Sequence, residues 1–299
     1  MKGDRPLRSV LFVPGSKSRM LDKARGLGAD AVILDLEDAV APSEKAGARG
    51  MIWDALGAGC YAPRVVVRVN AFDTGLTEDD VRETLAPGVD AICLPKAQAA
   101  EDVRRMAALL DRQEAARGLP AGATGLLVMI ETALAVLTAF DIARASGRVQ
   151  ALCLGGEDLS RELGAVRSKE GLELAQARAH LVLAARAAGV LAIDTVYTDL
   201  QDEAGLVAET RTARLLGYSG KLLIHPSQIQ PVHCAFAPTQ EELAYARRLV
   251  EAFDRAQARG EGAIAFEGKM IDAPVVARAR EVLLRDTALH LRHYLSEKP

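Results

Sequence analysis

The chain has 299 residues, of which 49% are hydrophobic and 26% are charged, a composition typical of a globular protein. A chain of this length buries enough surface to fold without a disulfide or a structural metal. Its 37 basic and 40 acidic side chains give a formal charge of −3, and 4% of its residues are aromatic. Both values argue against a nucleic-acid-binding protein, which usually presents a basic face and aromatic platforms for bases.

Cysteine usage and hydropathy predict where the protein works. The four cysteines form no C-x-x-C pair, and the two that lie in apolar runs, Cys93 and Cys153, are expected to be buried and reduced. The N-terminal run of strand-forming residues, Ser9 to Val13, is too short for the core of a signal peptide. No stretch approaches the roughly 20 apolar residues of a membrane helix. We therefore expect a soluble, cytoplasmic protein that does not bind membranes.

Eight short apolar segments predict the strands of a parallel sheet, because strands covered by helices on both faces are apolar throughout. They recur about every 25 to 40 residues, which is the spacing of β–α units. The segments between them carry apolar residues at helical spacing, such as Val103, Met106, Ala107 and Leu110, or Leu172, Ala175, Ala179, Val182 and Leu183. Eight units favour an α/β fold of the (β/α)₈ TIM-barrel type over an open doubly wound sheet. The predicted strands are Ser9–Val13, Ala31–Leu36, Arg64–Asn70, Ala91–Pro95, Gly125–Ile130, Ala151–Gly155, Leu191–Asp194 and Lys221–His225.

The pattern changes after the eighth predicted strand, which suggests a barrel of residues 1–228 and a C-terminal helical extension of residues 229–299. Within the extension, the sequence predicts one long helix from Glu241 to Arg259 and then a loose, glycine-rich connection. A last helix is expected to open at Asp272 and to run to about Tyr294. The extension could pack on the barrel, cover its mouth as a lid, or reach a neighbouring subunit.

Polar residues follow nearly every predicted strand. They would lie at the carboxyl-terminal end of the barrel, where the active sites of such barrels are found. Polar loops are ordinary, but Glu131 lies directly between two apolar segments, where a carboxylate is unfavourable unless it is paired or binds a metal. Asp158 follows Gly155 and Gly156, and glycines let the backbone approach a ligand closely. Two carboxylates with no histidine or cysteine nearby suit a hard cation such as Mg²⁺, with Mn²⁺ as a substitute. The other polar strand-end residues are Ser16, Asp35, Glu37, Asp38, Arg68, Asn70, Lys96, Thr132, Glu157, Asp194 and His225.

Two basic features have more than one interpretation. Arg68 lies alone among valines, where it could pair with Glu37 or Asp38, clamp a substrate carboxylate or enolate, or do both. Arg19 and Lys23 lie one turn apart on the helix that follows Pro14-Gly15-Ser16. The amides of that loop could hold an anion, although an exposed basic face is the more ordinary interpretation.

The motifs taken together resemble the citrate lyase β subunit and malyl-CoA lyase family over nearly the whole chain. The resemblance implies a (β/α)₈ barrel with a C-terminal extension, assembled as a homotrimer or homohexamer. It also implies Mg²⁺-dependent cleavage or formation of a carbon–carbon bond beside an acyl thioester. The motifs that carry it are Leu11-Phe-Val-Pro-Gly15, Ala31-Val-Ile-Leu-Asp-Leu-Glu-Asp-Ala-Val40, Arg68-Val-Asn70, Cys93-Leu-Pro-Lys96, Met129-Ile-Glu-Thr132, Leu154-Gly-Gly-Glu-Asp-Leu159, Ile224-His-Pro226 and Gly268-Lys-Met-Ile-Asp-Ala-Pro274.

The resemblance also assigns roles to individual residues. It implies that Glu131 and Asp158 are the metal ligands, with Glu131 also touching the substrate, and that Arg68 clamps substrate oxygens. It implies CoA or substrate contacts for Phe12, Arg19, Lys23 and the backbone near Leu223, and supporting positions for Glu37 and Asp38, which would order Arg68 and metal-bound waters. Asp272 matches the catalytic acid that the lid brings to the site, in some members from a neighbouring subunit. The residues alone would make Asp272 a helix N-cap.

The function that the resemblance implies is a CoA-ester lyase acting on malyl-CoA, citramalyl-CoA or a close relative, with acetyl-CoA and glyoxylate or pyruvate as products. The alternatives are a malyl-CoA thioesterase, a citrate lyase β subunit acting on a citryl–carrier-protein thioester, a non-catalytic CoA-ester-binding protein and an aldolase of free 2-keto acids. The segment Met270–Pro274 favours the stand-alone lyase, since some β subunits have shorter tails. The joint presence of Arg68, Glu131, Asp158 and Asp272 argues against a non-catalytic role.

Overall fold

The computed structural model describes residues 7–296, and side chains as far as residue 284. The chain divides into two compact units, with the boundary between His233 and Cys234. Each unit has its own strands and its own apolar core, and each is described separately below.

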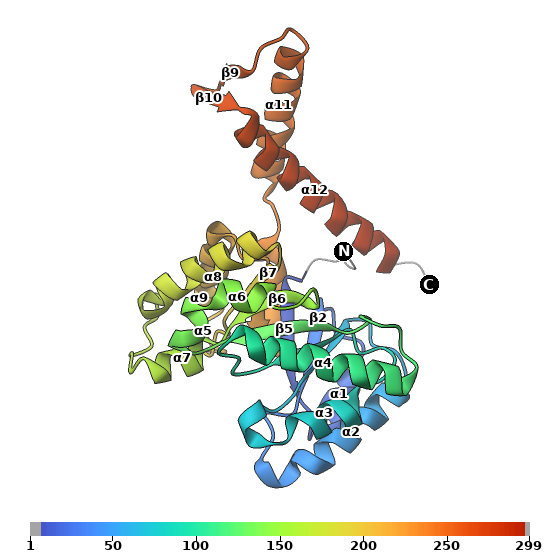
Figure 1. Cartoon of the computed structure of the whole chain (residues 1–299). Coiled ribbons are helices and arrows are strands. Elements are labelled where there is room, and N and C mark those ends of the chain that lie inside the picture. The colour runs from blue at the N-terminus through green and yellow to red at the C-terminus, as the bar shows by residue number, and fades with distance from the viewer. Residues whose placement is uncertain (1–6, 297–299) are drawn as a thin grey trace. The chain divides into compact units, whose positions relative to one another are not determined.

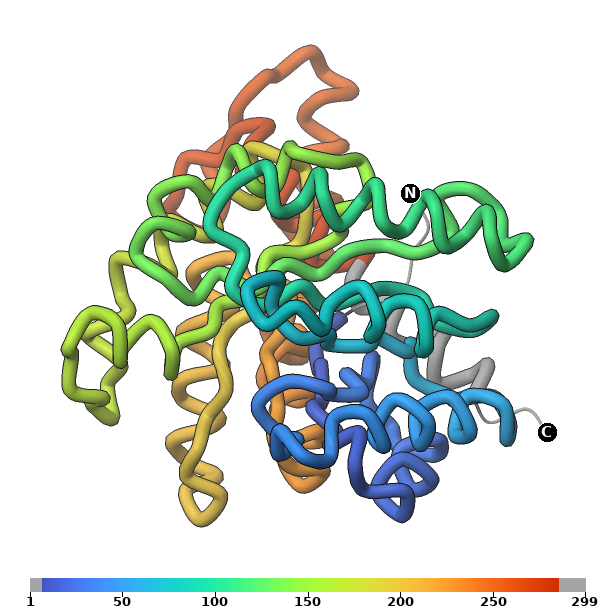
Figure 2. The backbone as a smooth tube through the Cα atoms, turned by 60° about the horizontal axis from the view of Figure 1, so that its bottom comes forward, coloured from blue at the N-terminus to red at the C-terminus, as the bar shows by residue number. Residues whose placement is uncertain are grey.

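The first unit is a closed barrel of eight parallel strands in sequence order (Figures 1 and 2). Pairing of Ser9 with Lys221 and of Leu11 with Leu223 closes the ring between the first strand and the last. The predicted α/β barrel and all eight of its strands are confirmed, although several strands end one or two residues before the predicted end. The strands are β1 (Ser9–Pro14), β2 (Ala31–Asp35), β3 (Arg64–Arg68), β4 (Ala91–Leu94), β5 (Gly125–Ile130), β6 (Val149–Leu154), β7 (Leu191–Asp194) and β8 (Gly220–Leu223).

The barrel interior is filled by alternate residues of the strands, because successive side chains point to opposite faces. Cys93 and Cys153 lie in this interior and are fully buried, as the sequence predicts. The same alternation decides which residues beyond the core face inward at the strand ends, and this places the functional side chains.

Helices surround the barrel as a layer (Figure 2). In α4 the predicted apolar face is buried through Val103, Met106 and Leu110. Near α8 the prediction was mostly wrong: Val182 is buried, but Leu172, Ala175, Ala179 and Leu183 are exposed, and the helix buries Ala177, Leu181, Ala184 and Ala185 instead. Leu172 belongs to a separate 3₁₀ turn, η3 (Leu172–Leu174), and is therefore out of phase with α8. The helices are α1 (Ser18–Ala24), α2 (Lys45–Gly57), α3 (Thr77–Thr84), α4 (Ala100–Arg117), α5 (Ala133–Leu137), α6 (Ala139–Arg144), α7 (Gly156–Glu162), α8 (Ala175–Ala188), α9 (Glu203–Leu216) and α10 (Ile229–Phe236), which crosses the unit boundary.

The second unit contains the helices α11 (Gln240–Gln257) and α12 (Ala273–Ser296) and a hairpin between them. The predicted loose connection is wrong: β9 (Ala263–Phe266) pairs antiparallel with β10 (Lys269–Asp272). Glu267 and Gly268 form the turn, and both have positive φ, as tight hairpin turns require. Ile271 of the hairpin is buried against apolar side chains of both helices. Within the described chain, no helix has the length and apolarity needed to cross a membrane.

Candidate active site

A cavity of about 430 Å³ lies among the residues that follow β3, β4, β5 and β6. The carboxyl ends of the strands in a barrel are where active sites lie. Both carboxylates that the sequence singled out as metal ligands, Glu131 and Asp158, line this cavity. The other lining residues are Ala71, Phe72, Asp73, Pro95, Lys96, Ala97, Gln98, Asp102, Thr132, Arg161 and Glu162.

Glu131 directly follows β5 and is 2% exposed. The inward alternation of Leu127 and Met129 continues to Glu131, so the side chain enters the barrel mouth. Its Oε1 accepts a hydrogen bond from the Lys96 amide at 2.6 Å. Burial, together with the neighbouring carboxylates of Glu37 and Asp158, raises the pKa of Glu131 to about 7. The protein alone therefore stabilises the charge of Glu131 poorly, and a cation would stabilise it further.

Gly155 provides the room that Glu131 occupies. A Cβ at Gly155 would lie 2.4 Å from the Glu131 Cβ and 2.5 Å from its Oε2, closer than atoms can approach. The sequence attributed the two glycines before Asp158 to close approach of a ligand. In the structure, Gly155 makes space for the Glu131 side chain, and a Cβ at Gly156 would lie 2.6 Å from Thr195 Oγ1.

Asp158 lies in the first turn of α7, and about a quarter of its side chain is exposed. Arg161, one turn later, contacts Asp158 Oδ1 through Nη2 at 2.7 Å. The part of the chain that the structure describes has no group of three or more His, Cys, Asp or Glu side chains able to hold a metal. Two carboxylates facing one cavity nevertheless fit Mg²⁺, which commonly keeps several waters and takes further oxygens from a substrate.

Arg68 ends β3 and is held mainly by Asp35 at the end of β2. Its Nε and Nη2 donate to the two Asp35 carboxylate oxygens at 2.7 and 2.5 Å. Its Nη1 lies 3.0 Å from Glu37 Oε2 and 3.6 Å from Asp38 Oδ2, and the guanidinium lies 4.6 Å from the centre of the Phe12 ring. The sequence analysis expected Glu37 or Asp38 as the partner and did not select Asp35. Strand alternation could have identified it, since Ile33 and Val66 face inward and Asp35 and Arg68 follow them by two residues.

Glu37 is a buried acid between two cations. Arg68 Nη1 and Lys96 Nζ each lie 3.0 Å from one of its carboxylate oxygens, yet no described group makes a well-aligned hydrogen bond to either oxygen. Burial raises the pKa of Glu37, and Arg68 offsets that effect only in part. Lys96 is a residue of this cluster that the sequence analysis noted at a strand end but did not select as a site residue.

Several other predicted residues lie apart from the cavity. Arg19 and Lys23 are exposed on α1, and Leu223 is the buried last residue of β8. Asp272 belongs to the second unit, where it is exposed at the end of β10. Its Oδ1 accepts a hydrogen bond from the Val275 amide at 3.3 Å, which is the contact of a helix N-cap.

Asp194 was counted among the polar residues at the barrel mouth, and this was wrong. Its neighbour Ile193 faces the barrel interior, so Asp194 faces the helix layer. There its carboxylate binds Arg178 at 2.9 and 3.1 Å and Lys221 at 2.9 Å. Asp194 and Lys221 are fully buried, and this cluster serves the packing of the helices on the barrel.

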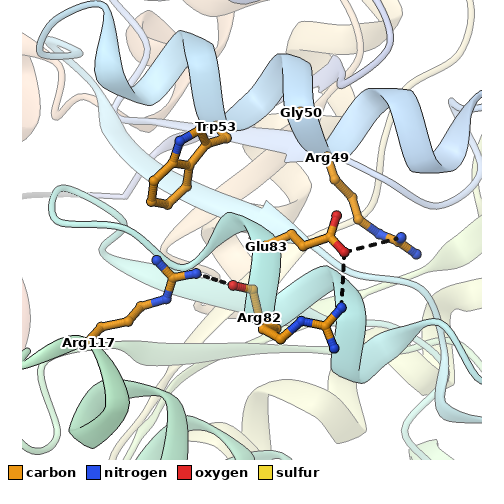
Figure 3. Close-up of a pocket in the computed structure, with 6 residues that line it drawn as sticks. All are labelled: Arg49, Gly50, Trp53, Arg82, Glu83 and Arg117. Atoms are coloured by element: carbon orange, nitrogen blue, oxygen red, sulfur yellow. Dashed lines mark hydrogen bonds and ion pairs between the residues drawn. The ribbon is translucent and has the colours of Figure 1, made fainter.

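A second cavity lies between α2, α3 and α4 and is lined by three arginines, Glu83, Gly50 and Trp53 (Figure 3). Arg49 Nε donates to Asp80 at 2.7 Å, and Arg82 Nη2 donates to Glu83 at 3.1 Å. Arg117 lies over the Trp53 ring and donates to the backbone carbonyl of Arg82. Each guanidinium that lines this cavity therefore already has a partner within the protein.

The closed barrel and the two carboxylates in one cavity at its carboxyl end are the fold and the site of a (β/α)₈-barrel enzyme. A family model described as HpcH/HpaI aldolase/citrate lyase matches residues 8–226. The chain therefore belongs to the HpcH/HpaI aldolase/citrate lyase family, and the resemblance seen in the motifs is confirmed.

Known relatives extend the match over nearly the whole chain. The citrate lyase subunit beta of Escherichia coli K12 is 44% identical over 282 residues, which are 94% of this chain and 93% of that protein. A (3S)-malyl-CoA thioesterase of Cereibacter sphaeroides ATCC 17025 is 39% identical over 95% of this chain and 96% of its own length. A crystal structure of protein CitE from Mycobacterium tuberculosis in complex with magnesium, acetoacetate and coenzyme A is similar with a TM-score of 0.79. It is 35% identical and covers 94% of this chain and 98% of that chain.

The match to the E. coli subunit can be compared with the expectation that some citrate lyase β subunits have shorter C-terminal tails than this chain. The part of this chain outside that alignment is about 6%, roughly 18 residues, and is shorter than the 27 residues that follow Asp272. The aligned region therefore includes Asp272. The presence of the Met270–Pro274 segment does not separate a stand-alone lyase from a citrate lyase β subunit.

Proposed function

We propose that the protein is a Mg²⁺-dependent lyase that cleaves or forms the carbon–carbon bond of a 3-hydroxyacyl-CoA such as malyl-CoA or citramalyl-CoA. The products of cleavage would be acetyl-CoA and a 2-keto acid, glyoxylate or pyruvate. The observation that carries the proposal is the buried Glu131 carboxylate, with its pKa raised to about 7, in one cavity with Asp158. Magnesium and coenzyme A in the CitE structure support it.

Glu131 and Asp158 are the residues that would hold Mg²⁺. When bound, the ion lowers the pKa of a substrate hydroxyl and compensates negative charge on that oxygen. The arrangement of the protein agrees with this assignment, because an uncompensated buried carboxylate beside a second carboxylate favours a cation. Arg161 would have to release Asp158 for the metal to bind, and an exposed pair of this kind is held by less than about 1 kcal/mol.

The other residues would bind the substrate and transfer its protons. Cleavage removes the hydroxyl proton and leaves the bonding electrons on the thioester as an enolate, whose carbon must then gain one proton. Arg68, fixed by Asp35, would supply positive charge for the enolate or the carboxylate without having to reorganise. Asp272 would protonate the enolate carbon, or remove the methyl proton in the condensing direction. In a homotrimer or homohexamer it could serve its own or a neighbouring subunit.

The coenzyme A part of the substrate would bind at the side of the mouth formed by β1, α1 and β8. Phe12, the exposed bases Arg19 and Lys23, and the backbone near Leu223 are the proposed contacts. Basic side chains on an exposed helix suit the phosphates of coenzyme A, which are charged at neutral pH.

A second candidate function is the β subunit of a citrate lyase, acting on a citryl thioester of an acyl carrier protein. The 44% identity to the E. coli subunit across 94% of the chain favours it. A malyl-CoA thioesterase, which would hydrolyse the same thioester, is favoured by the 39% identity to the C. sphaeroides enzyme. All three functions would use the same site. They differ in whether the thioester is carried by coenzyme A or by a carrier protein, and in whether the acyl group is cleaved at a carbon–carbon bond or hydrolysed from the thioester.

The test is a coupled assay of glyoxylate and pyruvate release from malyl-CoA and citramalyl-CoA, with Mg²⁺, with EDTA, and with the Asp272→Asn variant. Release that needs Mg²⁺ and is lost in the variant supports the CoA-ester lyase. Release of free CoA without a keto acid indicates the thioesterase. If neither ester reacts and a citryl–carrier-protein thioester is cleaved, the β-subunit alternative holds.

A further inference from the structure

Lys96 has an unusual backbone conformation at the cavity. Its φ is 51°, in the left-handed region that residues with a Cβ rarely adopt. In the described part of the chain, Glu267 is the other non-glycine residue with a positive φ, and it forms a hairpin turn. Lys96 is not in a hairpin and follows Pro95 at the end of β4. Unfavourable backbone geometry of this kind concentrates at functional sites.

This conformation lets one residue reach two buried acids. The Lys96 amide donates to Glu131 Oε1 at 2.6 Å, while its ammonium lies 3.0 Å from Glu37 Oε1. A glycine would place the amide equally well and adopt this φ without strain. The backbone contact therefore does not explain a lysine here, and the role of this residue must involve its side chain.

All three nitrogens of Arg68, the other strong cation of the cluster, face carboxylates of the protein. Arg68 gives Nε and Nη2 to Asp35 and places Nη1 against Glu37, and it is not among the residues that line the cavity. Lys96 does line the cavity. An ammonium has three donors, and Glu37 at 3.0 Å and Asp38 at 3.9 Å are the carboxylates that face it. Lys96 therefore keeps donor capacity at the cavity surface.

A substrate carboxylate entering this cavity meets mostly like charge. Glu131, Asp158, Asp73, Asp102 and Glu162 line the cavity, and the cations among the lining residues are Lys96 and Arg161. Arg161 is paired with Asp158. Even with a divalent cation bound by Glu131 and Asp158, a second positive group is needed if an anionic substrate is to bind well.

We propose that Lys96 is a substrate-binding residue whose ammonium holds the carboxylate of the 2-keto acid half of the substrate. The inference rests on the proposed function and extends it to the recognition of that carboxylate. In a 3-hydroxyacyl-CoA this carboxylate is next to the hydroxyl-bearing carbon, and it becomes the carboxylate of the keto acid on cleavage. Glu37, 3.0 Å away, keeps the ammonium in place. A hydrogen bond from the ammonium to the substrate carboxylate would be among the stronger ones, because both groups are charged.

The test measures condensation of acetyl-CoA with glyoxylate or pyruvate by Lys96→Met and by Lys96→Gly, which removes the side chain and eases the backbone. Loss of a charged hydrogen bond predicts a rise of about 10- to 100-fold in the KM for the keto acid, with the KM for acetyl-CoA unchanged. Lys169→Met is the matched control, since Lys169 is exposed and pairs with Asp202 outside the cavity. Thermal unfolding of both variants checks that they fold.

Chemical rescue tests whether the ammonium itself is what Lys96 contributes. Treatment of Lys96→Cys with 2-bromoethylamine restores an ammonium of nearly the same length and should lower the KM for the keto acid again. Treated wild-type protein is the control, because Cys60 and Cys234 are exposed. A fall in kcat with an unchanged KM for the keto acid in Lys96→Met, or no rescue, would overturn the proposal.

A binding measurement distinguishes failure of this inference from failure of the proposed function. Oxalate has a carboxylate next to a second carbonyl carbon, as a 2-keto acid does, and its binding can be measured without turnover. Calorimetry with Mg²⁺ should show oxalate binding to wild-type protein and about 10- to 100-fold weaker binding to Lys96→Met. Equal oxalate affinity of the wild type and Lys96→Met would contradict the proposed role of Lys96. Inactivity of the wild type with every thioester would count against the proposed function alone.

Discussion

Arg68 and Asp35 occupy paired positions on neighbouring strands and are joined by two parallel hydrogen bonds, at 2.7 and 2.5 Å. Both side chains are buried. A bidentate pair of this kind fixes the plane of the guanidinium, so Nη1 is held against Glu37 in one orientation. The pair therefore links the stability of the barrel to the geometry of the site.

Asp35→Asn should destabilise the protein by about 3 to 5 kcal/mol, because it leaves the buried Arg68 with one ionic partner fewer. Urea unfolding measures the effect, and Arg68→Met should cost a similar amount. The double variant should lose clearly less unfolding free energy than the sum of the two single losses. The reason is that Arg68→Met removes the buried charge that Asp35→Asn leaves without its partner. Simple additivity would contradict the coupling inferred from the structure.

Glu131 makes the stability of the metal-free protein depend on pH. Its pKa in the folded protein, about 7, is above the ordinary value of 4.5, so between these values the folded state holds the proton more tightly than the unfolded state. This contribution is present below about pH 4.5 and is lost as the pH rises to about 7, on the order of 3 kcal/mol in all.

Unfolding of the wild type and of Glu131→Gln in EDTA, at about pH 5 and at about pH 7.5, tests this contribution. The wild type should lose more stability than the variant between the two values, because glutamine does not titrate. A wild type and a variant with the same dependence on pH would show that Glu131 titrates normally.

Gly155→Ala should displace the Glu131 side chain, since the new Cβ would lie 2.4 Å from the Glu131 Cβ. We expect a loss of activity of about 100-fold or more and weaker Mg²⁺ binding, because a ligand that is misplaced by 1 Å loses much of its effect. Gly47→Ala in α2 is the control, because nothing lies within 4 Å of a Cβ there, and it should leave the activity unchanged. Full activity of Gly155→Ala would contradict the steric argument.

Lys221→Met tests the ionic cluster under the helix layer. Lys221 is fully buried, 2.9 Å from Asp194 and 2.6 Å from Glu209. Removing its charge leaves two acids with Arg178 alone, and we expect a loss of about 3 to 5 kcal/mol in unfolding free energy. The KM values should not change in protein that remains folded. A change in KM without a change in stability would instead place this cluster in the site.

The barrel could be predicted from the sequence because continuous apolar strands have few alternative explanations. Glu131 could be singled out because a carboxylate next to such a strand is unusual, and it does line the cavity. Asp35 and Asp194 illustrate what was missed: both end strands, yet Asp35 faces the barrel interior and Asp194 the helix layer. Strand alternation decides between the two, and it can be applied only when the inward residues of each strand are known.

The sequence indicates the role of Lys96 and the hairpin of the second unit less clearly than it indicates the barrel. A left-handed φ at a lysine leaves no mark in the sequence, since that conformation is usually inferred from glycine or asparagine. In the extension, three glycines suggested a loose connection, although Glu267 and Gly268 form a tight turn between two short strands. Their register depends on packing of Ile271 against both helices, which is a tertiary contact.

A Mg²⁺ site formed by Glu131 and Asp158 is central to the proposed lyase, and calorimetric titration of Mg²⁺ into metal-free protein tests this site most directly. The wild type should bind the ion in the presence of oxalate, and Glu131→Gln and Asp158→Asn should each weaken binding by at least about 10-fold, because each removes one of two charged ligands. Unchanged Mg²⁺ affinity in both variants would contradict the site and the lyase mechanism built on it.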